Sequence, residues 1–142
     1  MNIETIALLT VFVPILGSLT IPLAGLLARQ ARSAWSVALG AATAVLPMLL
    51  LPTAFAGGET IIRKELVLGL DFVLIIDPLS IFMAVVSSFV GFLIIVYSLG
   101  YIRHEENQNE YYLLVVLFIG SMMGLVFSAN LIFLYLFWEI IA

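Results

Sequence analysis

Five apolar stretches separated by short polar segments dominate the hydrophobic pattern of this chain. About 20 consecutive apolar residues are enough for a helix to cross the hydrocarbon core of a bilayer. The pattern therefore predicts five membrane segments, at residues 4–28, 34–56, 78–101, 111–129 and 130–142. The last segment is short, because its helical length is only ~20 Å. We expect this helix to be incomplete, so that another polypeptide continues it or other helices bury it.

The polar segment between the second and third spans is the longest of the chain. Two short stretches rich in β-branched residues, Thr60–Val67 and Phe72–Ile76, predict a small extramembrane hairpin there. Asp77 followed by Pro78 is typical of a helix start, with the aspartate as N-cap and the proline at the first helical position. Asn130 is predicted to cap the last helix in the same way.

Composition supports a single transmembrane domain over residues 1–142. The chain is 64% hydrophobic and 10% charged, whereas soluble domains carry about 25% charged residues. The net charge of −4 comes from loop residues and implies nothing about nucleic acid, but the lack of a basic stripe argues against nucleic acid as a partner. The chain has no cysteine and one histidine, His104, so we expect neither disulfides nor a metal site or other cofactor. The surroundings implied are a lipid bilayer.

The distribution of lysine and arginine predicts an orientation, because cytoplasmic loops carry an excess of both residues. Arg29, Arg32 and Arg103 fall in the first and third predicted loops. Arg63 and Lys64 fall in the second predicted loop, on the other side. This distribution favours an external N-terminus.

Glu139 is a lone carboxylate within the apolar last span. If Asn130 marks the membrane surface, nine helical residues place Glu139 ~13 Å deep, near the middle of a ~30 Å hydrocarbon core. Ionisable residues at this depth are costly and usually functional. We interpret Glu139 as a proton-binding or ion-pairing carboxylate; the alternative is a residue that snorkels to the interface. Tyr135, one turn earlier, shares its face and is a supporting candidate. Trp138 is a second supporting candidate, although we expect it mainly to pack.

Two further groups of residues are interpreted as structural. Small side chains on the third and fourth spans permit close helix approach: Ser87, Ser88, Gly91, Gly120 and Gly124. Tyrosines flank the third loop, as expected of an aromatic belt at the membrane surface: Tyr97, Tyr101, Tyr111 and Tyr112. No nucleophile–base pair or phosphate-binding loop is evident in the sequence, so we predict no catalytic or redox chemistry in this chain itself.

Five motifs occur in a distinctive order along the chain: Asp77-Pro-Leu-Ser80, Tyr97-Ser-Leu-Gly-Tyr-Ile102, Tyr111-Tyr112, Ser128-Ala-Asn130 and Trp138-Glu139. In this order the chain resembles the N-terminal part of the antiporter-like membrane subunits. That family is shared by respiratory complex I (NADH-quinone oxidoreductase), the Mrp sodium/proton antiporters and membrane-bound hydrogenases. The resemblance extends over nearly the whole chain, but over about a third of a typical family member.

The resemblance implies that Glu139 belongs to a proton-translocation path and pairs with a lysine two helices further on. The only lysine of this chain is Lys64, in a loop, and the sequence stops at Ala142. The expected partners are therefore other membrane subunits of a large hetero-oligomeric complex, one of which supplies a buried lysine. The implied location is an energy-transducing membrane, the plasma membrane of a prokaryote.

These observations predict a short or split antiporter-like subunit that contributes Glu139 to proton or sodium translocation. Translocation would be coupled to redox chemistry or to an ion gradient. Two alternatives remain open. One is a structural or assembly subunit without a transport role, and the other is a small proton-coupled exporter that acts as a homo-oligomer.

Overall fold

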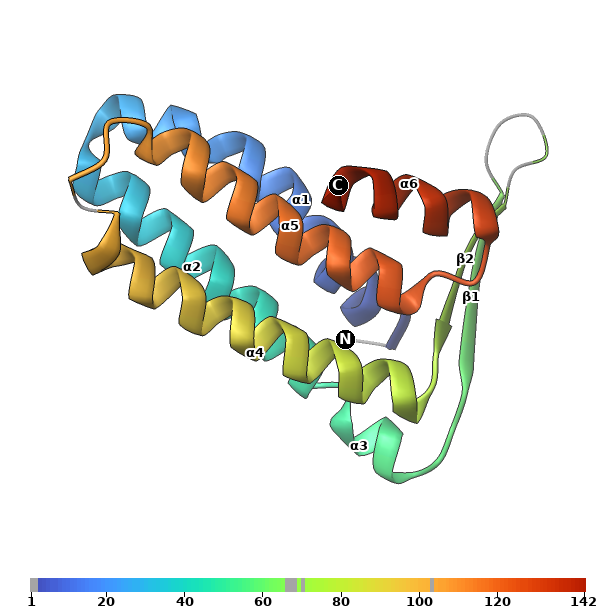
Figure 1. Cartoon of the computed structure of the whole chain (residues 1–142). Coiled ribbons are helices and arrows are strands. Elements are labelled where there is room, and N and C mark those ends of the chain that lie inside the picture. Colours follow the sequence, from blue (N-terminus) through green and yellow to red (C-terminus); the bar gives the residue numbers. More distant parts are fainter. Residues whose placement is uncertain (1–2, 66–68, 70, 103) are drawn as a thin grey trace.

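The computed structural model describes residues 3–65, 69, 71–102 and 104–142. Within these residues the chain is mainly helical, with one small hairpin (Figure 1). The elements, in chain order, are α1 (Ile3–Leu27), α2 (Arg29–Met48), α3 (Leu51–Phe55), β1 (Thr60–Glu65), β2 (Asp71–Ile76), α4 (Pro78–Tyr101), α5 (Gln108–Phe127) and α6 (Leu131–Ile141).

Four stretches of the described residues are long and apolar enough to cross a membrane: Ile3–Leu27, Arg29–Phe55, Pro78–Tyr101 and Gln108–Phe127. The remaining apolar helix, α6, has only 11 residues. At ~1.5 Å per residue it extends ~17 Å, about half of the ~30 Å hydrocarbon core. The predicted all-α membrane fold is therefore confirmed, with a short last helix.

The four long helices form a bundle. The contacts run from α1 to α2 and α5, from α2 to α4, and from α4 to α5. Figure 1 shows these helices lying along one another, with the α1–α2 and α4–α5 connections at one end and the hairpin at the other. The end that carries the hairpin is called the hairpin end, and the opposite end is called the connection end.

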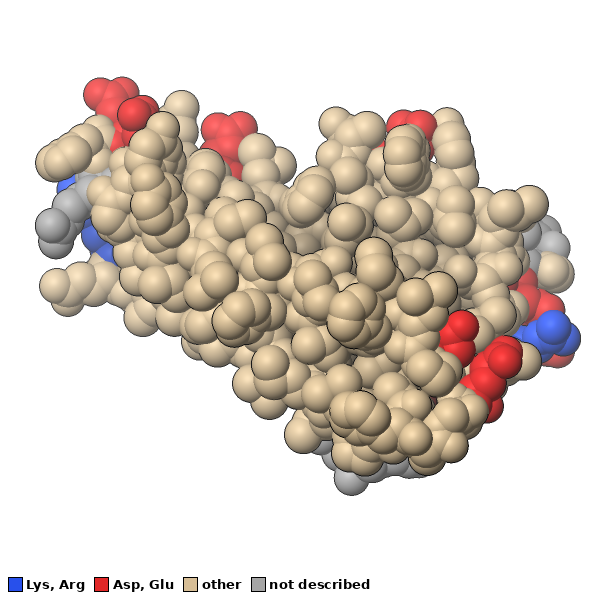
Figure 2. All heavy atoms as spheres, turned by 60° about the horizontal axis from the view of Figure 1, so that its bottom comes forward, with Lys and Arg blue, Asp and Glu red and all other residues tan. Residues whose placement is uncertain are grey.

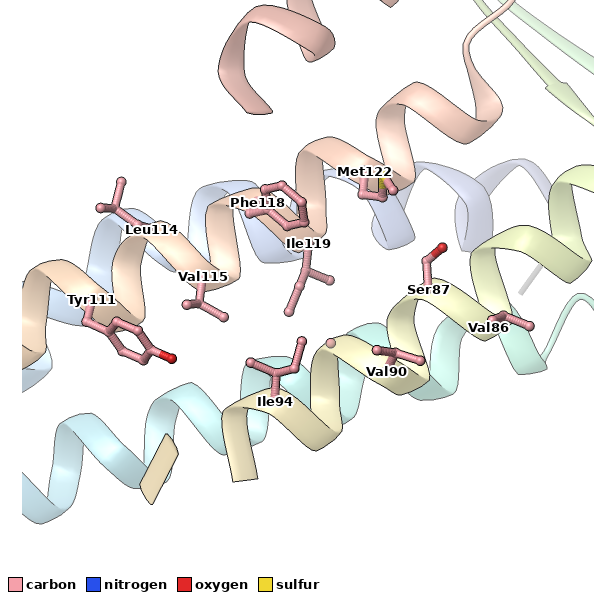
Figure 3. Close-up of a pocket in the computed structure, with 11 residues that line it drawn as sticks. Val86, Ser87, Val90, Ile94, Tyr111, Leu114, Val115, Phe118, Ile119 and Met122 are labelled. Carbon is pink, nitrogen blue, oxygen red and sulfur yellow. The ribbon is translucent and has the colours of Figure 1, made fainter. Parts of the chain in front are cut away.

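Glycines bring these helices close together, as the small-residue pattern predicts. A Cβ atom on Gly120 of α5 would lie 2.7 Å from Cγ1 of Ile15 and 3.0 Å from its backbone nitrogen on α1. A Cβ atom on Gly91 of α4 would lie 2.7 Å from the side chain of Ile119, which points from α5 toward α4 (Figure 3). Ser88 is buried, and its hydroxyl donates to its own helix at the Val85 carbonyl, 3.1 Å away. These residues serve packing, because larger side chains would separate the helices.

The second predicted span is wrong at its start, whereas its end lies within one residue of the observed span Arg29–Phe55. The sequence predicts residues 34–56, yet α2 begins at Arg29, and Ala28 alone separates it from α1. Ala28 has extended backbone angles, φ −169° and ψ 154°, which suffice to reverse the chain. Helix α2 ends at Met48, and α3 restarts with Pro52 in its first turn, where a proline needs no hydrogen-bond donor.

The predicted hairpin is present in the second connection. Strands β1 and β2 are antiparallel, from the pair Thr60–Ile76 to the pair Glu65–Asp71. Val67, predicted as the end of the first strand, lies outside the described residues. Burial alternates strictly along β2, because alternate side chains of a strand point to opposite faces. The hairpin therefore lies with one face on the helices.

The turn between α5 and α6 is attached to this hairpin. The backbone amide of Ala129 donates to the Val73 carbonyl at 3.0 Å, and Ser128 forms an isolated antiparallel bridge with Leu74. The predicted caps are also present. The Ser80 amide donates to Asp77 Oδ1 at 2.8 Å, and the Ile132 amide donates to Asn130 Oδ1 at 2.8 Å. The hairpin, the turn and the start of α6 thus form one hydrogen-bonded unit.

Buried apolar residues of the described chain form two clusters. The larger one lies under the hairpin and includes Phe72, Leu74, Ile76, Ile81, Met123 and Phe127. The other one lies toward the connection end and comprises Ile21, Leu39, Ile95, Tyr112, Val116 and Ile119. Many large apolar side chains stay exposed, and Figure 2 shows most charged groups toward the two ends of the molecule, a few acidic groups along its upper edge, and a broad uncharged surface between the two ends. Such a surface is suited to lipid or to further membrane helices.

Candidate functional site

Helix α6, which carries the predicted site residue Glu139, is fixed at its start by Asn130. The Oδ1 atom of Asn130 accepts a hydrogen bond from the Ile132 amide at 2.8 Å, and its Nδ2 atom donates to the Asp71 carbonyl at 2.8 Å. One side chain therefore caps α6 and ties it to β2. From this point α6 runs back along α5 (Figure 1). Glu139 lies nine residues beyond Asn130, or ~13 Å along the helix.

Phe137 determines which side of α6 faces the bundle. It is the buried residue of this helix, at 6% exposure, and its ring lies against Gly124 of α5. Each helical residue turns the side chain by ~100°, so Glu139 and Tyr135 are each rotated ~200° from Phe137, one in each direction. Both therefore face away from α5, as their exposure confirms.

Among the described residues, neither supporting residue forms a hydrogen bond or an ion pair with Glu139. Tyr135 is 60% exposed, and no hydrogen bond joins it to Glu139 among the described residues. Trp138 is 59% exposed in this chain, so the expectation that it packs stays a prediction. Tyr135 and Glu139 lie on one face of α6, as predicted. Both side chains are exposed on that face, which a further helix or lipid can cover.

The cations of the hairpin end are engaged with other carboxylates. Lys64 Nζ lies 2.7 Å from Glu4 Oε1, and Arg63 Nε lies 3.9 Å from Asp71 Oδ2. In the part of the chain that the structure describes, no ion pair involves Glu139. No cluster of three or more histidine, aspartate or glutamate side chains is placed to hold a metal ion among these residues either. An ion-pair partner of the Glu139 carboxylate is therefore not among the described residues.

A polar cluster at the connection end, which sequence reasoning missed, centres on Arg32. The side chain is 6% exposed, with Nη1 donating to Asn109 Oδ1 at 2.8 Å and Nη2 donating to Gln108 Oε1. The guanidinium carbon also lies 5.9 Å from the centre of the Tyr112 ring, a cation–π distance. Arg32 thus joins α2 to the start of α5. The sequence gives no signal for this, because the amides lie 76 and 77 positions away.

The predicted aromatic belt is correct for some tyrosines and wrong for one. Tyr97 and Tyr101 are 70% and 67% exposed and stack with ring centres 5.7 Å apart, consistent with an interfacial position. Tyr111 is half-buried, and its hydroxyl lies 2.8 Å from Ser98 Oγ. Tyr112, at 2% exposure, packs in the second apolar cluster beside Arg32. It is a core residue, because the packing of α5 against α1, α2 and α4 buries it.

Comparison with protein families gives a match over part of the chain. Residues 67–112 match the family described as NADH-Ubiquinone oxidoreductase (complex I), chain 5 N-terminus. The matched range runs from the hairpin through α4 to the start of α5. It ends before α6, so it carries no information on Glu139.

Curated relatives match a larger part of the chain. The Na(+)/H(+) antiporter subunit A1 of Staphylococcus haemolyticus is 32% identical over 135 aligned positions, which cover 93% of this chain. The subunit of the same name from Staphylococcus aureus is 30% identical over the same coverage. The chain spans 17% of the length of each of these relatives.

The fold has a solved counterpart. A chain in the structure of the membrane-bound sulfane sulfur reductase, described as an archaeal respiratory membrane complex, superposes with a TM-score of 0.84 at 17% sequence identity. The superposition covers 95% of this chain and 28% of that chain. At this identity the likeness shows the fold alone.

Sequence and structure therefore agree on the class of protein. Four membrane-length apolar helices and the bacterial and archaeal relatives identify an integral membrane protein of the prokaryotic membrane. The expected resemblance to antiporter-like membrane subunits is confirmed: residues 67–112 match the N-terminal family model of a complex I chain, and 93% of this chain aligns with an Na(+)/H(+) antiporter subunit.

Proposed function

We propose that this chain is the N-terminal segment of an antiporter-like subunit in a multisubunit membrane complex, and that Glu139 takes part in moving protons or sodium ions through it. The names of the relatives support the general kind of protein, since they are subunits of Na(+)/H(+) antiporters. The fold counterpart from a respiratory membrane complex supports assembly with other membrane subunits. Neither comparison assigns a role to a particular residue.

The placement of Glu139 supports its role. The side chain projects from the outward face of an otherwise apolar helix, ~13 Å along that helix from Asn130. A carboxylate at such a depth costs about 2–4 kcal/mol unless it is paired or protonated. It has no ion-pair partner in the described chain, so its partner comes from a further segment or subunit that covers this face of α6.

A buried lysine is the partner that the resemblance implies, and its chemistry suits translocation. A carboxylate surrounded by hydrocarbon favours the protonated form, and a nearby ammonium group favours the ionised form. Movement of the lysine toward and away from Glu139 would release and rebind one proton in each cycle. For sodium, the same carboxylate oxygens would serve as hard ligands when the lysine is withdrawn.

The test is Glu139→Gln in the complete membrane assembly, with ion transport measured in vesicles. We expect transport to fall more than about tenfold, because the amide neither binds nor releases a proton. Glu59→Gln is the matched control, since Glu59 is an exposed carboxylate outside the helices at the hairpin end. Normal transport by Glu139→Gln in a normally assembled complex would refute the role of Glu139.

The same experiment separates the two alternatives. A purely structural subunit would tolerate Glu139→Gln, whereas deletion of the chain would prevent assembly. A self-sufficient exporter would transport when this chain alone is reconstituted into liposomes. Transport that requires the other subunits and is lost with Glu139→Gln supports the proposal against both alternatives.

A further inference from the structure

Arg32 carries a buried charge that forms no ion pair among the residues that the structure describes. Its side chain is 6% exposed, and none of the nine carboxylates of the sequence, all of which are described, forms an ion pair with it. The two terminal nitrogens donate to the neutral amide oxygens of Asn109 and Gln108. The Nε atom is buried and has no hydrogen-bond partner. Buried charges are normally paired, so a complementary anion is missing from this set of contacts.

The unpaired guanidinium lines a hollow of about 350 Å³ at the connection end. Arg29, Gln30 and Ser33 of α2 line the same hollow. The wall is therefore formed on one side by two guanidinium groups, an amide and a hydroxyl, all of which donate hydrogen bonds. The other lining residues are Leu99, Gln108 and Tyr112. A concave site with this set of donors is suited to an anion with several oxygen atoms.

The start of α2 contributes to the same preference. Helix α2 has 20 residues, and its N-cap, Ala28, provides no side-chain hydrogen bond to the first turn. The first backbone N–H groups of a helix have no partner within the helix, and the helix dipole adds positive potential there. Anionic phosphate groups commonly bind at such a position. Arg29 and Arg32 lie in this first turn and place two full positive charges beside it.

We propose that this hollow binds a phosphate group, and that in the membrane the phosphate belongs to the headgroup of an anionic phospholipid. The hollow lies at the end of the apolar bundle, where lipid headgroups are located. Leu26 and Leu27, 80% and 84% exposed, end α1 two to three residues before Arg29 and offer apolar surface to acyl chains. Basic pockets between membrane helices bind anionic headgroups by this combination of charge and apolar surface.

The experiment uses the chain as purified from its membrane, with the subunits that accompany it. It is placed in nanodiscs of phosphatidylcholine, of phosphatidylcholine with phosphatidylglycerol, or of phosphatidylcholine with added inorganic phosphate. Thermal unfolding and lipid retention by native mass spectrometry are recorded. We expect phosphatidylglycerol to be retained and to raise the melting temperature. Stabilisation by inorganic phosphate alone, without a phosphatidylglycerol preference, would show a phosphate site but refute the lipid as its source.

Two variants test whether phosphatidylglycerol binds in this hollow. Arg29→Gln alters an exposed side chain, so it should fold, and we expect it to weaken phosphatidylglycerol binding at least about tenfold by loss of a charge-assisted hydrogen bond. Arg63→Gln removes an arginine at the hairpin end and should leave binding unchanged. Equal binding by both variants and the unmodified chain, or no preference for phosphatidylglycerol over phosphatidylcholine and no effect of phosphate, would overturn the proposal. An anion from a neighbouring protein subunit would then be the remaining occupant.

Discussion

At the scale of single residues, Asn130 has the widest influence on α6. It caps the helix through Oδ1 and holds it to β2 through Nδ2. Asn130→Ala removes both bonds, and we expect it to lower the free energy of unfolding by about 2 kcal/mol. Asn130→Asp keeps the cap acceptor and loses the donor, so about half of that loss should remain. Thermal unfolding in detergent measures both variants. An Asn130→Asp variant as stable as the unmodified chain would show that the bond to Asp71 contributes nothing, whereas equal losses in the two variants would show that the cap contributes nothing.

Asp77 provides a second prediction, on pH. Hydrogen bonds from Ser80, from its side chain and its backbone amide, lower the pKa of the Asp77 carboxyl below the ordinary value of 3.8. A carboxyl whose pKa is lowered by folding stabilises the fold above its ordinary pKa, and this contribution is lost as the pH falls through the lowered value. The contribution is at most about 1 kcal/mol, because an N-cap is worth that much.

Asp77→Asn isolates this contribution, since the amide keeps the cap acceptor and does not titrate. The stability advantage of the unmodified chain over the variant should be constant at neutral pH and shrink below about pH 4. Melting temperatures of the two proteins at stepped pH values measure this difference, in which the other carboxylates cancel. A difference that stays constant down to pH 3 would contradict the assigned cap.

At the scale of elements, glycines determine how closely the helices approach. A Cβ atom on Gly120 would lie 3.0 Å from the backbone nitrogen of Ile15, which cannot rotate away as a side chain does. We expect Gly120→Ala to destabilise the bundle by about 1–3 kcal/mol. Gly100→Ala on α4 is the matched control, because no atom lies within 4 Å of its added Cβ atom, and it should be neutral or slightly stabilising. Chemical unfolding of the two variants compares them, and equal losses would refute the close contact.

The elements also show how far the sequence determines the structure. Helix α4 was predicted at its observed bounds because Asp77 and Pro78 act locally, within one turn of the helix they start. The hairpin was predicted from local β-branched stretches for the same reason. The start of α2 was not predicted, because Arg29 and Arg32 were interpreted as residues of the first loop. Arg32 is instead buried through contacts with α5, which only the packed bundle brings within reach.

The candidate site also has some features that the sequence predicts and others that only the packed structure shows. Glu139 was recognisable from the sequence because the cost of a lone carboxylate in an apolar helix depends on its immediate neighbours. Its outward direction was not predictable, since it follows from the packing of Phe137 on Gly124. The hollow around Arg32 draws residues from α2, α4 and α5, so no local pattern could reveal it.

At the scale of the whole molecule, the positive charges lie at two ends separated by the membrane-length helices. Arg29 and Arg32 lie at the connection end, while Arg63 and Lys64 lie at the hairpin end. The predicted external N-terminus places the hairpin outside and the connection end in the cytoplasm. That orientation would put the Arg32 hollow in the cytoplasmic leaflet, where anionic lipids attract basic residues.

Cysteine labelling tests this orientation without background from the chain itself, which has no cysteine. Glu59→Cys and His104→Cys place single thiols at exposed positions near the hairpin end and the connection end. In right-side-out vesicles, a membrane-impermeant maleimide should modify Glu59→Cys at once and His104→Cys only after permeabilisation. Modification of both from one side would contradict the bundle as a spanning structure. Reversed sides would leave the fold intact but contradict the orientation inferred from charge, and Glu139 would then be approached from the cytoplasmic side.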